Sequence, residues 1–166
     1  MKNSLPSRFP ALSVVVMVVT AIALIAKPKT WNFDNDKMQE LPSGWLSEHT
    51  GQGSKGNWKV LADPTAPSRP NVLAQLSDDA TNYRFPLAIY QPISAKNVEV
   101  TLRFKPVAGR VDQAGGIAVR VTSPNHYSLV RANALEDNVR FYRIVNGRRE
   151  ELASADIKVA SNEWHT

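Results

Sequence analysis

The sequence predicts an all-β domain, a two-sheet antiparallel β-sandwich of jelly-roll type, preceded by an apolar N-terminal helix. Three observations favour this fold. Residues 97–106 alternate between apolar and polar side chains, the pattern of a half-buried strand. Pro124-Asn125 and Asn146-Gly147 are two-residue turn sequences between apolar runs, and Asn-Gly is the strongest short hairpin signal. After residue 30 the chain shows no convincing helical period, and turn residues recur at short intervals.

The first 26 residues have the pattern of a targeting segment. Lys2 and Arg8 precede an apolar run from Ala11 to Ala26, which is shorter than the roughly 20 residues that a membrane helix needs. The pattern indicates a cleaved secretory signal peptide or, as the alternative, an uncleaved membrane anchor. In both cases we expect residues 27–166 outside the cytoplasm, secreted or periplasmic, with membrane contact only through an uncleaved N-terminal segment.

The first half of the domain holds short strands separated by turns. Strands are expected at 57–61 and 72–76, and the stretch 62–71 between them contains three prolines and is interpreted as a surface loop. Residues 84–91 form a further strand, at a sheet edge or with a bulge, because Pro86 has no N–H to donate to a ladder.

The second half holds the clearest strands. Gly115-Gly116 enters an alternating strand, and the chain stops at Trp164-His165, which resembles the opening of one more strand. We therefore expect this chain to be a fragment that lacks the final strands of the sandwich. The strands expected in this half cover residues 97–106, 117–121, 126–132, 139–145 and 151–153.

Composition excludes several classes of function. The 166 residues are 43% hydrophobic and 21% charged, which is typical of one folded domain. The absence of cysteine excludes a disulfide scaffold, a thiolate zinc site and a cysteine nucleophile. The net charge of +5 is modest and its basic residues are scattered, so no nucleic-acid partner is expected. The three histidines are isolated in sequence, which argues against a zinc site. No serine has a G-x-S-x-G context, so serine hydrolase chemistry has no support.

Several short motifs between residues 31 and 166 point to one family. They are Trp31-Asn32-Phe33-Asp34, Gly44-Trp45, Asn57-Trp58-Lys59-Val60, Gly115-Gly116, the block 125–138 and Trp164-His165. In these motifs the chain resembles the concanavalin A-like lectin/glucanase superfamily, in particular its laminin-G-like domains and the domain named for 3-keto-disaccharide hydrolases. The resemblance implies a jelly roll over residues 27–166 whose concave sheet or rim loops bind glycans. The glucanases of that superfamily carry E-x-D-x-x-E on one strand; that triplet does not occur here, so their chemistry is not carried over.

The candidate binding site lies on the strands of the second half. Arg120, Arg131 and Arg143 fall on neighbouring strands at positions that could share one face, and Tyr127 shares a strand face with Arg131. Sugars pack their C–H faces on aromatic rings while their hydroxyls need polar partners. The alternatives are a solvated sheet face for the arginines and a core position for the tyrosine. The predicted binding residues are Arg120, Tyr127, Arg131, Asn133, Glu136 and Asp137.

Glu136 and Asp137 allow three interpretations: an acid/base pair, a calcium site, or a loop whose side chains bond their own backbone. No D-x-D-x-D spacing accompanies them, and adjacent acids in an extended chain point to opposite faces. No cofactor is therefore expected, with calcium as the alternative.

The most direct expectation is an exported domain that binds a glycan or cell-surface polysaccharide. One alternative, implied by the family resemblance, is a hydrolase or lyase acting on a 3-keto-disaccharide or related glycoside. A second is a structural envelope or adhesion module without a small ligand. A binding module should show an exposed aromatic ring beside polar groups in a groove, an enzyme two converging acids or an acid and a histidine, and a structural module neither.

Overall fold

The structure is a computed structural model that describes residues 27–166, so the predicted targeting segment lies outside the described residues. Residues 31–166 form one compact unit, and the fold below is that of this unit. Within the described part of the chain, no helix is long and apolar enough to cross a membrane.

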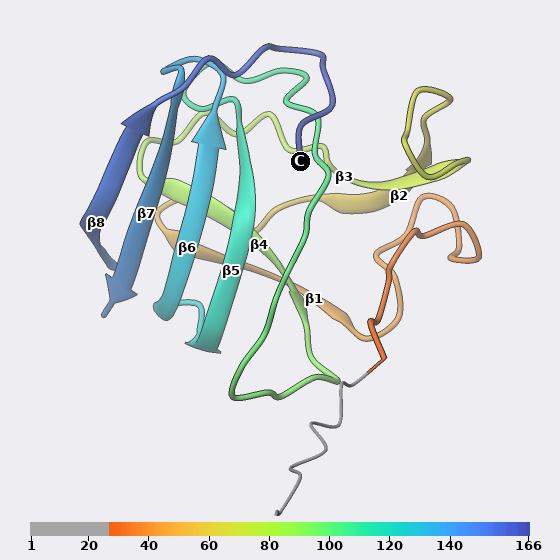
Figure 1. Cartoon of the computed structure of the whole chain (residues 1–166), viewed down its shortest axis with the longest axis horizontal. Coiled ribbons are helices and arrows are strands. Elements are labelled where there is room, and N and C mark those ends of the chain that lie inside the picture. Colours follow the sequence, from red (N-terminus) through yellow and green to blue (C-terminus); the bar gives the residue numbers. More distant parts are fainter. Residues whose placement is uncertain (1–26) are drawn as a thin grey trace, which may run out of the picture. The chain divides into compact units, whose positions relative to one another are not determined.

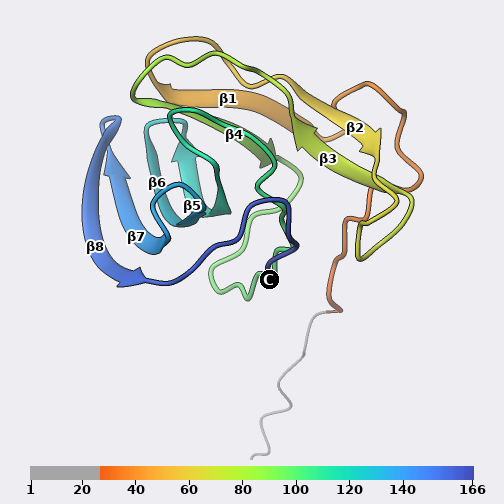
Figure 2. The same cartoon turned by 90° about the horizontal axis from the view of Figure 1, so that it is seen from above.

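All regular structure in this unit is antiparallel β-sheet, which confirms the predicted all-β class (Figure 1). Strands β5 to β8 form a four-stranded meander in chain order, whereas β1 pairs with β4 and β2 with β3. Seen from above, the β1–β4 pair lies across one face of the four-stranded sheet in a sandwich-like arrangement, and the β2–β3 pair lies beyond it to one side (Figure 2). The strands are β1 Trp45–Gly51, β2 Trp58–Ala62, β3 Asn71–Gln75, β4 Arg84–Tyr90, β5 Ala114–Ser123, β6 His126–Asn133, β7 Asn138–Val145 and β8 Arg148–Asp156.

The core lies between the two layers. Alternate residues of β6 and β7 point inward, and Tyr127, Tyr142 and Ile144 pack with Leu87 of β4. Each such buried side chain contributes about 1.5–3 kcal/mol relative to an exposed one. We call this side of the four-stranded sheet the inner face, and the opposite side the outer face.

The predicted hairpins are present. Asn146 and Gly147 join β7 to β8 with φ of 51° and 74°, and two successive positive φ values are what a type I′ turn requires. Pro124 and Asn125 likewise join β5 to β6. The Asn146-Gly147 turn fixes the register of β7 and β8, in which Ile144 lies opposite Arg149. In the register of β6 and β7, Arg131 lies opposite Arg140.

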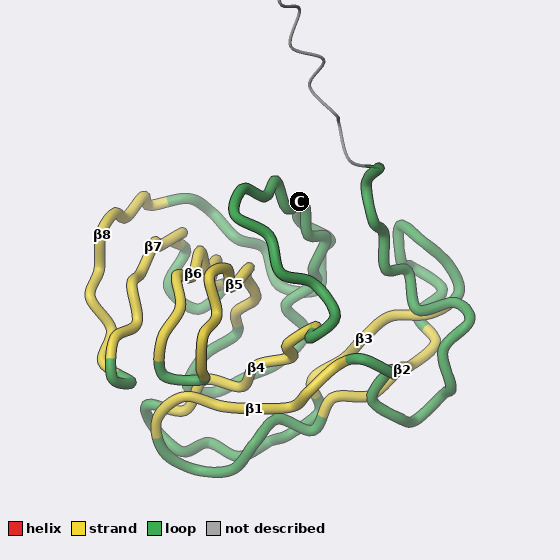
Figure 3. The backbone as a smooth tube through the Cα atoms, turned by 90° about the horizontal axis from the view of Figure 1, so that it is seen from below, coloured by secondary structure: helices red, strands yellow, loops and turns green. Residues whose placement is uncertain are grey.

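The segment 97–106, predicted as a strand from its alternation, is a loop connection between β4 and β5 (Figure 3). Its only ladder contact within the described chain is an isolated bridge between Phe104 and His165. Val98 and Val100 are exposed, and Phe104 packs its ring over Gly115, where a Cβ atom would lie 2.5 Å from the ring. Alternation of apolar and polar side chains gives a segment two different faces. A β-strand also needs a neighbouring strand that pairs with its backbone N–H and C=O groups.

Strand β1 was not predicted, because its inward positions do not form an apolar series. Leu46, Glu48 and Thr50 lie opposite the inward residues of β4. Thr50 is fully buried, and its hydroxyl bonds Tyr127 across the layers at 2.8 Å. A buried threonine with a specific partner leaves no periodic signal in the sequence.

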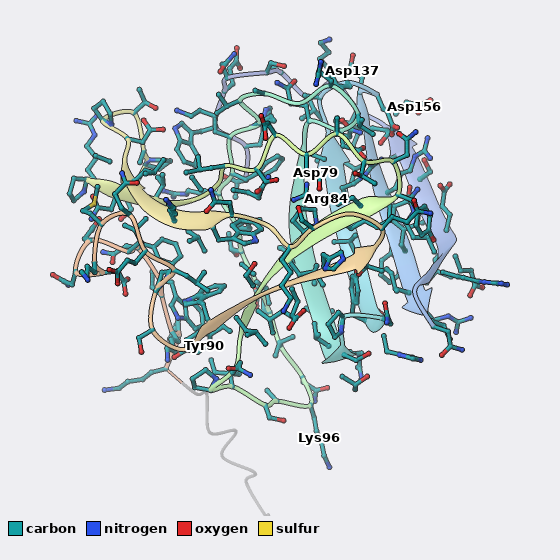
Figure 4. All side chains as sticks on the ribbon, turned by 180° about the vertical axis from the view of Figure 1, so that it is seen from behind. Asp79, Arg84, Tyr90, Lys96, Asp137 and Asp156 are labelled. Carbon is teal, nitrogen blue, oxygen red and sulfur yellow. The ribbon has the colours of Figure 1, made fainter. Side chains whose placement is uncertain are left out.

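The loop before β4 is held by an ion pair. Arg84 Nε lies 3.2 Å from Asp79 Oδ2, and Figure 4 shows the two side chains together at the start of β4. The same guanidinium donates to the carbonyl of Ser54, at 2.7 Å. These two contacts fix the position of Arg84, which lies between Tyr83 and Phe85 in the sequence.

Candidate functional site

A cavity of about 230 Å³ opens on the inner face, between the four-stranded sheet and the start of β4. Strands β6, β7 and β8 supply three arginines and a tyrosine, and the chain around Tyr83 supplies the opposite wall. We call this hollow the inner cavity. It is lined by Asn82, Tyr83, Phe85, Val111, Asp112, Arg131, Glu136, Arg140, Tyr142 and Arg149.

Arg131 joins two carboxylates at the floor of the inner cavity. Its Nη1 lies 2.9 Å from Asp112 Oδ1 and its Nη2 lies 2.7 Å from Glu136 Oε2. The alternation of β6 turns Arg131 inward, and it is only 8% exposed. Asp112 reaches it from just before β5, and Glu136 from the turn between β6 and β7.

Two asparagines orient these carboxylates. Asn133 is fully buried, donates to Asp112 Oδ1 at 2.8 Å and accepts from the backbone N–H of Leu135 at 3.0 Å. Asn138 donates to Glu136 Oε2 at 3.1 Å and accepts from Arg131 Nη2 at 3.2 Å. The paired ends of β6 and β7 place both amides, so the polar network is part of the hairpin itself.

The two carboxyl groups have pKa values displaced in opposite directions. Burial raises the pKa of Asp112 above its ordinary value, against the opposing effect of the Arg131 charge. The hydrogen bond from Asn138, followed by that from Arg131, lowers the pKa of Glu136. At neutral pH the pair therefore holds one carboxylate that is stabilised and one that burial makes easier to protonate.

An aromatic wall faces this network. The Arg149 guanidinium lies 4.4 Å from the ring centroid of Phe85, 5.2 Å from Tyr142 and 5.4 Å from Tyr83. Tyr83 is 40% exposed, and its hydroxyl donates to the Gly147 carbonyl at 3.1 Å. The exposed Tyr83 therefore lines the same hollow as two carboxylates and three guanidinium groups.

The backbone at Tyr83 is strained. Its φ is 57°, a left-handed conformation that costs a non-glycine residue about 1–3 kcal/mol. The Tyr83 carbonyl accepts from the N–H of Gln52 at 2.9 Å, and it lies where a Cβ on Gly51 would be, at 2.0 Å. The glycine at the end of β1 thus leaves room for the conformation that presents the tyrosine ring.

Three of the predicted site residues converge: Arg131, Asn133 and Glu136. Tyr127 lies on the same face of β6, as predicted, but it is only 4% exposed and bonds Thr50. Its burial raises the pKa of the phenol and makes it a core residue, the alternative stated for it.

The other predicted residues lie elsewhere. Asp137 is at the end of the four-stranded sheet (Figure 4), where it binds Lys158 Nζ at 2.8 Å and the N–H of Val159 at 3.1 Å. Arg120 is exposed at an irregularity of β5, with φ of 55°. Neither residue lines the inner cavity.

The expectation that Arg120, Arg131 and Arg143 share one face is wrong. Arg143 lies opposite Ser128, one position out of phase with Arg131, so it points from the outer face and pairs there with Glu150 at 2.6 Å. The register shift in β5 separates Arg120 from the regular alternation.

Sequence reasoning missed Asp112, Arg140, Arg149 and Tyr83. The Asn-Gly hairpin could have revealed Arg149, because its register pairs this residue with the inward Ile144. Alternation back from Ile144 reaches Arg140 by the same logic. Asp112 and Tyr83 lie just outside strands, where no period exists to place them.

No group of three potential metal ligands occurs among residues 27–166, and Glu136 and Asp137 diverge toward Arg131 and Lys158. Comparison with known proteins finds no family model, no curated protein and no solved structure that matches the chain. The geometry of the inner cavity is therefore the basis for the functional conclusion.

Proposed function

We propose that the domain binds glycans in the inner cavity and that it is an exported jelly roll of the concanavalin A-like type. The partner would be a glycan or a cell-surface polysaccharide met outside the cytoplasm. The observation that carries the proposal is the exposed Tyr83 ring on the wall of a hollow that also holds Asp112, Arg131 and Glu136. A sugar needs both an apolar ring surface and convergent polar groups, and this wall offers them together.

The proposed site differs from the sequence-based one at its aromatic member. Tyr83 takes the place of the buried Tyr127 as the ring on which a sugar would pack. Arg131 and Glu136 stay in the site, and Asn133 acts by orienting Asp112. The polar groups are held by one another, so they meet a ligand already oriented, which reduces the entropy lost on binding.

A glycan array with the full-length protein tests the proposal, followed by affinity measurements on two variants. Tyr83→Ala should weaken binding at least about tenfold, equivalent to about 1.4 kcal/mol. Phe141→Ala is the matched control, because Phe141 is also an exposed aromatic residue but belongs to the outer face, and it should leave affinity unchanged. Thermal unfolding of both variants checks that the fold persists. Equal affinity of both variants and the parent protein would reject the site.

One observation favours a hydrolase or lyase as the second candidate. Asp112 and Glu136 line the same cavity, bind the same guanidinium and have pKa values displaced in opposite directions. Environments that separate two carboxyl groups in this way are typical of an acid and a base acting on one substrate. Incubation with disaccharides, 3-keto-disaccharides included, tests this. Product formation that is lost in both Asp112→Asn and Glu136→Gln would favour the enzyme.

A further inference from the structure

The inner cavity carries more positive charge than its own acids balance. Arg131, Arg140 and Arg149 line it, against Asp112 and Glu136. Both of these acids bind Arg131. Neither acid of the cavity wall forms an ion pair with Arg140 or Arg149, although the charge of Asp112 reaches Arg149 and that of Glu136 reaches Arg140 at longer range.

The charges of Arg140 and Arg149 are balanced only weakly. Arg140 pairs with Glu151 at 3.3 Å, outside the cavity lining, and both side chains are more than a third exposed, where such pairs contribute little. No carboxylate among residues 27–166 forms an ion pair with Arg149, which rests on aromatic rings instead.

Arg131 and Arg140 are also direct cross-strand neighbours on the inner face. Like charges placed opposite each other destabilise an antiparallel pair. In addition, the Nε atoms of both residues are buried without a hydrogen-bond partner. A buried donor left unpaired costs about 1–3 kcal/mol, so this arrangement of arginines is costly to the stability of the fold.

We infer that the inner cavity recognises an acidic glycan, with the carboxylate of a uronic acid residue bound by Arg140 and Arg149 and the sugar ring packed on Tyr83. This inference rests on the proposed glycan-binding function and names its ligand class. A carboxylate is planar and accepts two parallel N–H bonds from one guanidinium, a geometry that guanidinium groups match better than a lysine would. The hydroxyls of the same sugar would donate to Asp112 and Glu136, whose oxygens are acceptors.

The size of the cavity agrees with a single charged sugar unit. Its volume of about 230 Å³ lies below the roughly 300–1,000 Å³ typical of sites for drug-sized ligands. A longer chain would therefore insert one residue and extend over the exposed rim at Tyr83. The walls carry one more positive than negative group, which suits a single monovalent anion.

Calorimetric titration of the full-length protein tests the inference. The ligands are oligosaccharides of galacturonate, of mannuronate with guluronate, and of glucuronate, each beside its carboxyl-reduced neutral counterpart and a sulfated neutral oligosaccharide. We expect at least one uronate series to bind, at least tenfold more tightly than its reduced counterpart and than the sulfated one. Its dissociation constant should rise with salt concentration.

Three variants test whether Arg149 binds the carboxylate of the ligand. Arg149→Gln should lose at least tenfold in uronate affinity, and Arg149→Lys, which keeps the charge but loses the planar fork, should lose less. Arg148→Gln is the matched control, because its neighbour in the register is Val145 on the outer face, and it should bind as the parent does. Unchanged affinity in Arg149→Gln would overturn the inference.

The choice of ligands distinguishes a failure of this inference from a failure of the proposed glycan-binding function. Equal binding of neutral and acidic oligosaccharides, lost in Tyr83→Ala, would overturn the acidic ligand and leave glycan binding in place. Preference for the sulfated ligand would overturn the carboxylate. Binding of no glycan in the series or on the array would overturn both.

Discussion

Replacing Arg131 with methionine should destabilise the domain far more than the same change at an exposed arginine of the same sheet. The change leaves Asp112 and Glu136 without the guanidinium that both of them bind. Breaking a fully buried charge pair costs about 3–5 kcal/mol. Because the two acids are 36% and 42% exposed and water screens them in part, we expect about 2–3 kcal/mol.

Arg143→Met is the control, since Arg143 pairs with Glu150 on the outer face and both side chains are 55% exposed. Such surface pairs contribute about 0.2–1 kcal/mol. Urea denaturation at pH 7 measures both free energies of unfolding, and Arg131→Met should lose about 2 kcal/mol more than the control. For a domain of this size the melting temperature of Arg131→Met should lie about 6–12 °C below that of the parent protein.

The stability lost in Arg131→Met should depend on pH. Burial raises the pKa of Asp112, and Arg131 opposes that effect, so losing Arg131 should raise this pKa further. A carboxyl whose folded pKa is above its unfolded value favours folding when protonated and disfavours it as pH rises through the folded pKa. The deficit of Arg131→Met should therefore shrink between pH 7 and pH 4. An equal loss in Arg131→Met and Arg143→Met, or a deficit independent of pH, would refute this reasoning.

Three further predictions concern the parts that hold the site. Gly51→Ala should cost at least about 2 kcal/mol in thermal unfolding, because its φ is 86° and its new Cβ would meet the Tyr83 carbonyl. Lys105→Met should reduce the acid sensitivity of the domain: hydrogen bonds from Lys105, and then from Thr65, lower the pKa of Asp63 to about 2, so their stabilising effect is present above about pH 4 and is lost as pH falls toward 2. Tyr127→Phe should cost about 1 kcal/mol and leave glycan affinity unchanged, since its hydroxyl bonds β1 inside the core.

Each of these has its own control. Gly147→Ala has a φ of 74° but meets only the side chain of Asn125, at 3.1 Å, so it should cost less than Gly51→Ala. Urea titrations between pH 5 and pH 2 compare Lys105→Met with the parent protein, and parallel curves would contradict the role of Asp63. A loss of glycan affinity in Tyr127→Phe would place that tyrosine back in the binding site.

Local patterns predicted the four-stranded sheet of β5 to β8 well. The alternation of β6 and β7 and the two positive φ values required of Asn146-Gly147 are properties of neighbouring residues, so the hairpins could be read directly. The segment 97–106 was predicted wrongly as a strand, because its alternation could not show that only Phe104 would form a β-bridge. Strand pairing over long distances depends on the rest of the chain.

The candidate site was predicted in part because it combines local and distant residues. Arg131, Asn133 and Glu136 lie within six residues of one another, and their types marked them as polar groups at a strand end. Tyr83 and Asp112 reach the same hollow from outside the strands, through the layer packing and the approach to β5. The register of β8 brings Arg149 to the inner face, a position that follows only once the turn geometry is known.

The most direct test of the central claim is a crystal structure of the protein with a bound uronate oligosaccharide. We predict one sugar ring against Tyr83 and its carboxylate about 2.7–2.9 Å from guanidinium nitrogens of Arg140 or Arg149. A sugar bound on the outer face of the four-stranded sheet, with the inner cavity empty of carbohydrate, would contradict the claim.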